Sequence, residues 1–230
     1  MSATLTLAEL MIAARQRADM ENSQFITDSE LISLINQSSY KLYNLLIQSY
    51  GDDYFVADPY EFTANGTDTL YPLPDNFLKL LGVDLISGTT QATTLLPFNL
   101  KERNKYANGG STAPYSVTRY RISGKNIWFA PKPSAGSQFR LYYVPTLPVL
   151  ADPSDTLEGV SGYTEFVILD VAIEMLLKEE SPIGDKQARL LELKQDIISG
   201  ASQRDITGIH TVTDVYGGAG YFSGVEYDGF

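Results

Sequence analysis

Few residues in this chain could carry chemistry. It has no cysteine, which excludes thiol catalysis, disulfides and cysteine-ligated metal sites. The single histidine, His210, has no neighbour in the sequence that could complete a catalytic triad or a metal site, and such sites need several groups in a fixed geometry. An exposed or interface histidine is therefore the better interpretation.

Carboxylates are the remaining candidates for acid–base or metal chemistry. Asp52 and Asp53 are adjacent, but such a pair more often ends a helix at a turn than serves a metal or a glycosidase. Asp152 and Asp155 lack the DxDxDG spacing of a calcium loop. Asp170, alone on an apolar stretch, is more typical of an ion pair across a helix bundle or a subunit contact than of catalysis. We expect no enzymatic activity, no catalytic or metal-binding residue and no cofactor.

The net charge of −11 is spread unevenly over the 230 residues. Residues 51–150 contain nine Lys or Arg and eight Asp or Glu, so the rest of the chain sums to −12. Binding of nucleic acid needs clustered basic charge, so the chain is a poor candidate for gripping DNA. The basic residues of the central part are expected to form a solvated face with the acids between them. They include Lys101, Arg103, Lys105, Arg119 and Arg121.

The chain contains no apolar run of the roughly 20 residues that a membrane span needs, so no membrane contact is expected. Its first 20 residues interrupt their apolar run with charges. They predict an amphipathic helix, not a signal peptide.

The stretch from Asp28 to Tyr50 predicts a long helix around which the other segments are organised. Thr27 and Glu30 have the spacing of a capping box, and Gly51 is a typical left-handed stop. Apolar side chains cover about half of the circumference, more than the stripe of roughly 100° that a surface helix needs. The polar stripe left for water is narrow: Ser33, Gln37, Lys41, Asn44 and Gln48. We expect this helix to be covered on two sides, the second side by an adjacent copy of the chain.

Three more helices complete the expected bundle. A second capping box begins a helix at about residues 7–19. Residues 163–180 are apolar almost all round and predict the most buried helix. A fourth helix is predicted to begin with Ser181 as its cap and Pro182 at its first position, and to end near Gly200. Its expected packing side is Leu190, Leu191, Leu193, Ile197 and Ile198.

Residues 60–144 predict six or seven short antiparallel strands. Asn65-Gly66 lies between two aromatic-rich segments, and Gly124-Lys125 lies between two alternating segments, so each predicts a tight hairpin. Residues 78–86 predict a buried strand that pairs with residues 93–98. The spacing of the turns is typical of a β-sandwich.

Together these patterns predict an α+β fold, in which an antiparallel β-sandwich or barrel-like domain is inserted into a four-helix bundle-like domain. The expected boundaries are residues 1–53 and 160–203 for the helical domain, 54–148 for the β-domain, 149–159 for a linker and 204–230 for an extended C-terminal arm. Residues 206–230 hold six glycines, five aromatic residues and no Lys or Arg. A disordered tail is usually charged and poor in aromatics, so this composition predicts a segment that orders against a partner.

The order of the segments resembles the head-to-tail adaptor proteins of tailed bacteriophages, also called connector or head-completion proteins. The local resemblance lies in TDSELISLINQSSYKLYNLL, LPDNFLKLLGVDL, PFNLKERNKY and RYRISGKNIWFAPKP, over about residues 5–144. It implies a structural virion protein in a ring, usually of twelve copies, at the neck between capsid and tail. Double-stranded DNA would pass through the channel of this ring as a non-specific passenger. Assembly would take place in the host cytoplasm.

The resemblance also implies partners and the residues that meet them. The partners are the portal protein, a tail nozzle or tail-completion protein, and further copies of the chain. The expected portal clasp is formed by Ile209, Val212, Val215, Tyr216, Tyr221, Phe222, Tyr227 and Phe230. The expected subunit interface is formed by Tyr40, Tyr43, Ile47, Tyr50 and Asp170.

An alternative interpretation is a carbohydrate- or ligand-binding β-sandwich on a helical stalk, as an accessory protein of a virion. Aromatic side chains can stack on sugars, although in a sandwich they more often belong to the core or an interface. The aromatic residues that motivate this alternative are Tyr60, Tyr71, Tyr115, Tyr120, Trp128, Tyr142 and Tyr143.

Overall fold

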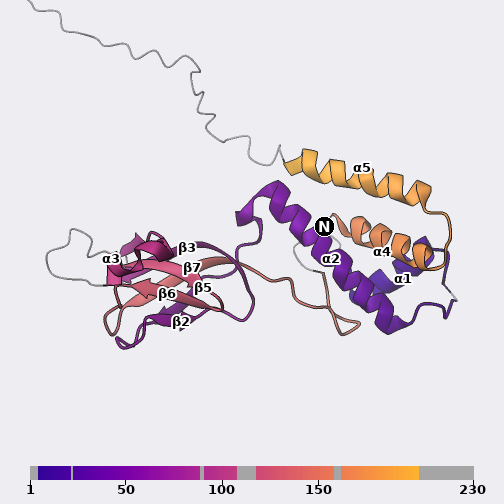
Figure 1. Cartoon of the computed structure of the whole chain (residues 1–230). Coiled ribbons are helices and arrows are strands. Elements are labelled where there is room, and N and C mark those ends of the chain that lie inside the picture. Colours follow the sequence, from indigo (N-terminus) through magenta and orange to yellow (C-terminus); the bar gives the residue numbers. More distant parts are fainter. Residues whose placement is uncertain (1–4, 22, 89–90, 108–117, 158–161, 202–230) are drawn as a thin grey trace, which may run out of the picture.

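The computed structural model describes residues 5–21, 23–88, 91–107, 118–157 and 162–201, apart from the side chains of Asp52, Asp53 and Ala107. It contains helices and antiparallel sheets in separate parts of the chain, so the predicted α+β class is confirmed. Figure 1 shows the long helices packed together on one side and the strands gathered on the other. The strands form two separate sheets and not one closed barrel.

Helix α2 (Asp28–Tyr50) has the predicted bounds. The Thr27 hydroxyl accepts a hydrogen bond from the backbone N–H of Glu30 at 3.3 Å, and Gly51 ends the helix with a φ of 96°. The second half of the predicted capping box is wrong, because the Glu30 carboxylate binds Lys178 Nζ at 2.7 Å instead. All five residues of the predicted polar stripe are exposed.

Helices α1 (Leu7–Arg17), α4 (Thr164–Lys178) and α5 (Gly184–Ala201) complete the helical part. Helix α4 contacts α1, α2 and α5, and every residue from Phe166 to Ile173 is buried. It is the central helix, as its apolar sequence predicts. Figure 1 shows α1 and α5 on different sides of it. The capping box that starts α1 is formed as predicted.

The predicted start of the fourth helix is wrong, because α5 begins at Gly184 and not next to Ser181. The backbone N–H of Ser181 is used at the end of α4, where it donates to the Leu176 carbonyl at 2.9 Å. Its hydroxyl donates to Glu179 at 3.1 Å. Ser181 therefore ends one helix and cannot cap the next.

The seven strands in the described residues pair with one another in antiparallel fashion, and Tyr120 of β5 also forms a parallel bridge with Pro97. The larger sheet has the order β1-β7-β3-β4 and the smaller sheet the order β2-β6-β5. The bounds are β1 Tyr60–Thr63, β2 Leu70–Pro72, β3 Phe77–Ser87, β4 Gln91–Thr94, β5 Arg119–Ser123, β6 Asn126–Ala130 and β7 Gln138–Pro145. Apolar side chains of both sheets, among them Val83, Phe129 and Phe139, share one core, which makes the pair of sheets a sandwich.

Two further short helical segments precede β5. A 3₁₀ turn, η2 (Leu100–Glu102), leads into helix α3 (Arg103–Ala107), and another 3₁₀ turn, η1 (Asp52–Phe55), follows α2. Figure 1 shows α3 at the end of the β-region that is remote from the long helices.

Of the two predicted hairpins, one is confirmed and one is wrong. Strands β5 and β6 form a hairpin around Gly124, whose φ is 60°. The turn at Asn65-Gly66 is formed, with Asn65 Oδ1 accepting from the backbone N–H groups of Thr67 and Asp68 at 2.9 and 3.0 Å. The strands on either side, however, belong to different sheets, since β1 pairs with β7 and β2 with β6. The turn carries the chain between the sheets, and Gly66 is required there because a Cβ would lie 2.8 Å from Ala135.

The segment between β7 and α4 packs against the helices. Leu147, Leu150 and Leu157 are buried in the helical core, and the Leu7 backbone N–H donates to the Asp155 carbonyl at 2.7 Å. The connection that the sequence predicts as a linker is thus bound to α1 and α2 along much of its length. The domain boundaries given above stay a prediction.

Candidate assembly surfaces

Every residue of the predicted portal clasp lies beyond Ala201, outside the described residues, and so does His210. The five residues of the predicted subunit interface are described. Four of them lie on α2 and the fifth, Asp170, lies on α4.

Tyr40 and Tyr43 of α2 bind the segment that follows β7. The Tyr40 hydroxyl donates to the Leu147 carbonyl at 2.9 Å, and the Tyr43 hydroxyl donates to the Pro145 carbonyl at 2.6 Å. Asn36 holds the same segment with both ends of its amide, donating to the Leu150 carbonyl at 2.9 Å and accepting from its N–H at 2.8 Å. The chain therefore supplies a second cover for α2 from its own residues 145–150.

The α2 side chains of the predicted interface differ in how much of their surface is exposed to a neighbouring copy. Tyr43 is 3% exposed, and its burial raises the pKa of its hydroxyl to about 12. Tyr40 is 36% exposed. Ile47 lines a groove of about 310 Å³ between α2 and β3, together with the exposed Leu78. An interface role for these residues stays a prediction, and Tyr40 and Ile47 are the ones with surface to offer.

Asp170 forms an ion pair within the chain, which is the role that its isolated position predicts. Lys41 Nζ lies 2.9 Å from Asp170 Oδ2 and 3.2 Å from Glu174 Oε1. Partial burial lowers the pKa of Lys41, but the hydrogen bonds and charges of Asp170 and Glu174 outweigh it, so the pKa lies above its usual value. The partner is a lysine of α2, on the helix that packs against α4.

A second ion pair joins the start of α2 to the end of α4. Lys178 of α4 binds both carboxylate oxygens of Glu30 at 2.7 Å and lies 5.0 Å from the centre of the Phe25 ring. Glu30, near the start of α2, meets Lys178 at the end of α4, whereas Lys41, further along α2, meets Asp170, nearer the start of α4. The two helices are therefore antiparallel and are linked by polar contacts along their length.

Tyr50, at the end of α2, contacts both Tyr163, the residue that precedes α4, and Gly200 of α5. Its hydroxyl lies 2.5 Å from the hydroxyl of Tyr163, and this hydrogen bond, with burial as a smaller cause, raises the pKa of Tyr163 to about 12. Gly200 of α5 packs on the pair so closely that a Cβ there would lie 3.2 Å from the Tyr50 oxygen. The end of α5, from which the chain continues to the arm, is thus seated on two hydrogen-bonded tyrosines.

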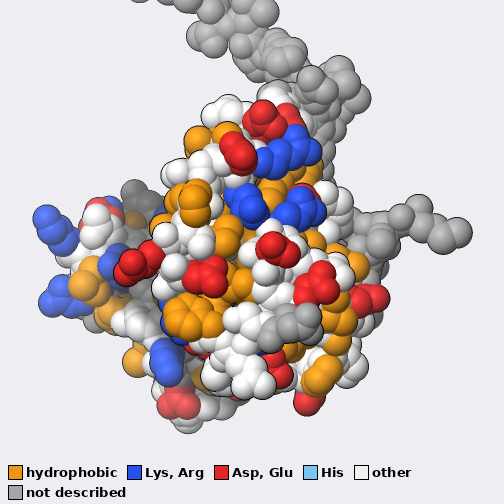
Figure 2. All heavy atoms as spheres, turned by 90° about the vertical axis from the view of Figure 1, so that its right-hand side faces the viewer, with side chains coloured by type: hydrophobic (Ala, Val, Ile, Leu, Met, Phe, Trp, Pro, Cys, Tyr) orange, Lys and Arg blue, Asp and Glu red, His pale blue; other side chains and the backbone are white. Residues whose placement is uncertain are grey.

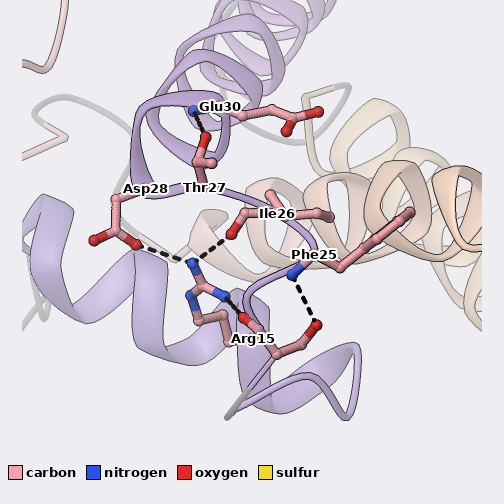
Figure 3. Close-up of polar contacts among 7 residues, drawn as sticks. Arg15, Phe25, Ile26, Thr27, Asp28 and Glu30 are labelled. Carbon is pink, nitrogen blue, oxygen red and sulfur yellow. Dashed lines mark hydrogen bonds and ion pairs between the residues drawn. The ribbon is translucent and has the colours of Figure 1, made fainter.

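Arg15 fixes the turn between α1 and α2, a role that no pattern in the sequence predicts. Its guanidinium donates to the carbonyls of Ser23 and Ile26 at 3.0 and 2.9 Å and to Asp28 Oδ1 at 2.9 Å. Figure 3 shows the side chain reaching from α1 beneath the start of α2. Backbone carbonyls carry no sequence signature, so only the spacing of Arg15 and Asp28 could have hinted at the contact.

The outer surface of α5 carries apolar side chains that no described residue covers. The apolar Ala188, Leu191 and Ile198 are exposed, Leu191 by 56% and Ile198 by 48%, and the polar Gln195 is exposed in line with them. The buried side of the helix is formed by Leu190 and Ile197, so the prediction that Leu191 and Ile198 pack inside the chain is wrong. Figure 2 shows the helical end of the molecule, where hydrophobic side chains alternate with both signs of charge.

The described residues offer little for catalysis. They contain no group of three His, Asp or Glu residues that could hold a metal ion. Asp155 accepts hydrogen bonds from the backbone N–H groups of Ala151 and Asp152 at 2.7 and 2.8 Å, which lower its pKa and close a turn. No helix among the described residues has the length and apolar character needed to cross a membrane.

The aromatic residues of the carbohydrate hypothesis lie mainly in the β-core. Tyr71 and Tyr143 are buried, and Tyr60 and Tyr120 pack against the same core. Trp128 packs on Phe98, with ring centres 5.3 Å apart, and Tyr115 lies outside the described residues. The buried and core-packed rings are not available for stacking on a sugar.

A packed helical part with an uncovered apolar stripe, a β-sandwich and an ordered connection between them are features of a structural assembly protein. A comparison with protein families identifies which one: the model of the SU10 adaptor protein family matches residues 5–212. The chain belongs to this family of bacteriophage structural adaptors, as its resemblance to head-to-tail adaptors predicts. A search of curated proteins gave no match.

Proposed function

We propose that the chain forms a ring, of about twelve copies, that joins the portal of the capsid to the tail and continues the DNA channel. Membership of the adaptor family supports a virion-associated connector that interacts with portal and tail proteins. The ring and the named contacts go beyond that membership and rest on the surfaces described above, and the copy number is carried over from the resemblance to head-to-tail adaptors.

The observation that carries the ring is the exposed stripe on α5. Ala188, Leu191, Gln195 and Ile198 follow one another at intervals of three, four and three residues, the spacing with which one helix packs along another. At 100° per residue the stripe is about 80° wide and lies well away from the buried side of the helix. An apolar stripe of this kind on an acidic protein marks a surface that is covered in the assembled state.

The position of α5 favours a ring over a two-fold dimer. Helices α1 and α5 lie on different sides of α4, so a neighbour that packs on α5 can present its α1 side, where Ile12 is 58% exposed. Contacts between two different faces continue from copy to copy and close into a ring when the rotation allows. In this arrangement α2 stands between neighbours, with Tyr40 and Ile47 at its edge.

The C-terminal arm, residues 204–230, is proposed to clasp the portal. It follows directly on α5, whose end is held by Gly200 on the pair of tyrosines. A glycine-rich segment with five aromatic residues can bury large side chains on a partner, and the cost of ordering it is met only on binding. The acidic helices suit a channel that DNA passes through without being held. The protein would act in the neck of the virion after assembly in the host cytoplasm.

The test is to mix the purified chain with portal rings and image the product by electron microscopy. We expect a ring of the chain on the portal. Removal of residues 206–230 is expected to abolish attachment while the circular dichroism and thermal unfolding of the rest stay unchanged. The proposal is wrong if no ring forms at high concentration. The role given to the arm is wrong if the shortened chain still attaches.

A further inference from the structure

Positive charge is concentrated in one part of this acidic chain. Residues 91–150 contain eight Lys or Arg and a single acid, Glu102, while the whole chain carries −11. The acids that balance the central region lie in residues 51–90, before these basic residues in sequence. Whether acids lie between these basic side chains in space therefore depends on where the fold places them.

The smaller sheet collects several of these charges on its outer side. Strand residues alternate between the two sides of a sheet, and on β5 it is Tyr120 and Ile122 that pack on the sandwich core, so Arg119 and Arg121 point outward. Arg121 lies directly opposite Trp128 of β6. Trp128 in turn lies opposite Leu70 of β2, which is 49% exposed.

Segments η2 and α3 extend this side of the sheet. Phe98 and Tyr106 pack with Trp128 and Ala130, which holds the two short helices against the outer side of β6. Arg119 lies 4.9 Å from the centre of the Tyr106 ring. Lys101, Arg103 and Lys105 are exposed on the helices so placed. We call the surface formed by Lys101, Arg103, Lys105, Arg119, Arg121 and Trp128 the basic face.

Four of the five cations of the basic face have no carboxylate partner among the described residues. Among the described residues no carboxylate pairs with Lys101, Arg103, Arg119 or Arg121, and Lys105 lies 3.9 Å from Glu102. Arg140, on the larger sheet, shows the contrast, since it lies 2.6 Å from Glu61. Uncompensated charges of one sign repel one another and favour a partner of the opposite sign.

The partner is better matched by an acidic protein surface than by DNA. Three large apolar side chains are exposed on or beside the basic face, Leu70 by 49%, Leu96 by 58% and Leu100 by 43%. A protein partner can cover such side chains and leave a charged rim, the usual anatomy of a protein interface. A phosphate backbone would neutralise the charges and leave the leucines in water.

We propose that the basic face is a docking surface for an acidic protein partner with an apolar centre. This inference rests on the proposed function only for the identity of the partner, which would be the tail nozzle or tail-completion protein. Helix α3, which carries part of the basic face, lies at the end of the β-region remote from the long helices and so away from α5 (Figure 1).

The chain carries its own reporter for the test, because Trp128 is its only tryptophan and lies in the basic face. Tryptophan fluorescence of the full chain is followed during titration with three probes: a peptide of glutamate and leucine, a peptide of lysine and leucine, and a short DNA duplex. We expect a saturable change with the acidic peptide that weakens as salt is raised. The lysine peptide should give none, and DNA should bind more weakly than the acidic peptide.

A double variant, Lys101→Glu with Arg121→Glu, should weaken binding of the acidic peptide by about tenfold or more. The matched control is Lys186→Glu with Arg189→Glu on α5, which makes the same change of charge elsewhere and should bind like the native chain. Circular dichroism checks that both fold. Unchanged binding by the double variant, or DNA binding as tightly as the acidic peptide, overturns the proposal.

The portal experiment keeps this result separate from the proposed function. The double variant should still form rings on the portal. A chain that binds the acidic peptide through the basic face but forms no ring on the portal would retain the docking surface and refute the proposed function. A chain that forms rings on the portal but does not bind the acidic peptide would support the proposed function and refute the docking surface.

Discussion

Lys41 Nζ lies 2.9 Å from Asp170 Oδ2, and this contact joins the most exposed side of α2 to the most buried helix of the protein. The two side chains differ in environment, since the lysine is 49% exposed and the aspartate 11%. Replacing Lys41 by Met leaves the buried carboxylate without its partner. We expect a loss of about 1–3 kcal/mol in the free energy of unfolding, between the values for surface and buried pairs.

Urea unfolding measures this loss, and Lys178→Met is the matched control. Its pair with Glu30 is exposed on both sides, at 40% and 38%, so its loss should stay below about 1 kcal/mol. Equal losses for the two variants would mean that burial of Asp170 does not matter.

The same ion pair predicts a change of stability at alkaline pH. The pKa of Lys41 is raised in the folded chain, so its contribution is fully present below the unfolded value of about 10.4 and is lost as the pH rises through the folded pKa. The difference in unfolding free energy between the native chain and Lys41→Met should be constant from neutral pH to about pH 10 and shrink above it. A difference that grows with pH would contradict the assignment.

Gly200 is expected to resist replacement although it lies within a helix. Alanine would favour the helix by about 1 kcal/mol, but its Cβ would lie 3.2 Å from the Tyr50 oxygen, which the hydrogen bond to Tyr163 holds in place. We expect Gly200→Ala to lower the thermal midpoint of unfolding. In a Tyr50→Phe background, where the oxygen is gone, the same change should raise it. The account is wrong if the change has the same sign in both backgrounds.

Arg15 should not tolerate replacement by lysine. Its two terminal nitrogens reach two carbonyls and a carboxylate from a planar fork, a geometry that the single nitrogen of an ammonium group does not reproduce. We expect Arg15→Lys to cost about 1–3 kcal/mol in chemical unfolding. The control, Arg17→Lys, alters an ion pair with Glu165 in which the arginine is 45% exposed, and should change stability by less than about 0.5 kcal/mol. Similar costs would argue against a special role for Arg15.

The sequence predicts best where several local signals agree. For α2 the capping residue, the apolar arc and Gly51 all point to the same bounds, and the structure has those bounds. The turn at Asn65-Gly66 was also recognised, but turn chemistry is local and does not choose the partner of a strand, so the hairpin inferred from it is wrong.

The site was harder to predict than the fold, for a physical reason. The covering of α2 by residues 145–150 depends on side chains that bind backbone carbonyls more than 100 positions away in the sequence. Such acceptors leave no pattern in the sequence. The stripe on α5 was visible as apolar residues, but only the packing of the chain tells which of them are left outside.

The central claim, that the copies pack through the outer stripe of α5, is tested most directly by imaging portal rings mixed with the variant Leu191→Asp with Ile198→Asp. Both side chains are about half exposed in the single chain, so the variant should fold and unfold like the native protein. We expect it to form no ring on the portal. Leu96→Asp, at an apolar position of the β-region that is 58% exposed, should form rings normally. Complete rings from the α5 variant would contradict the account.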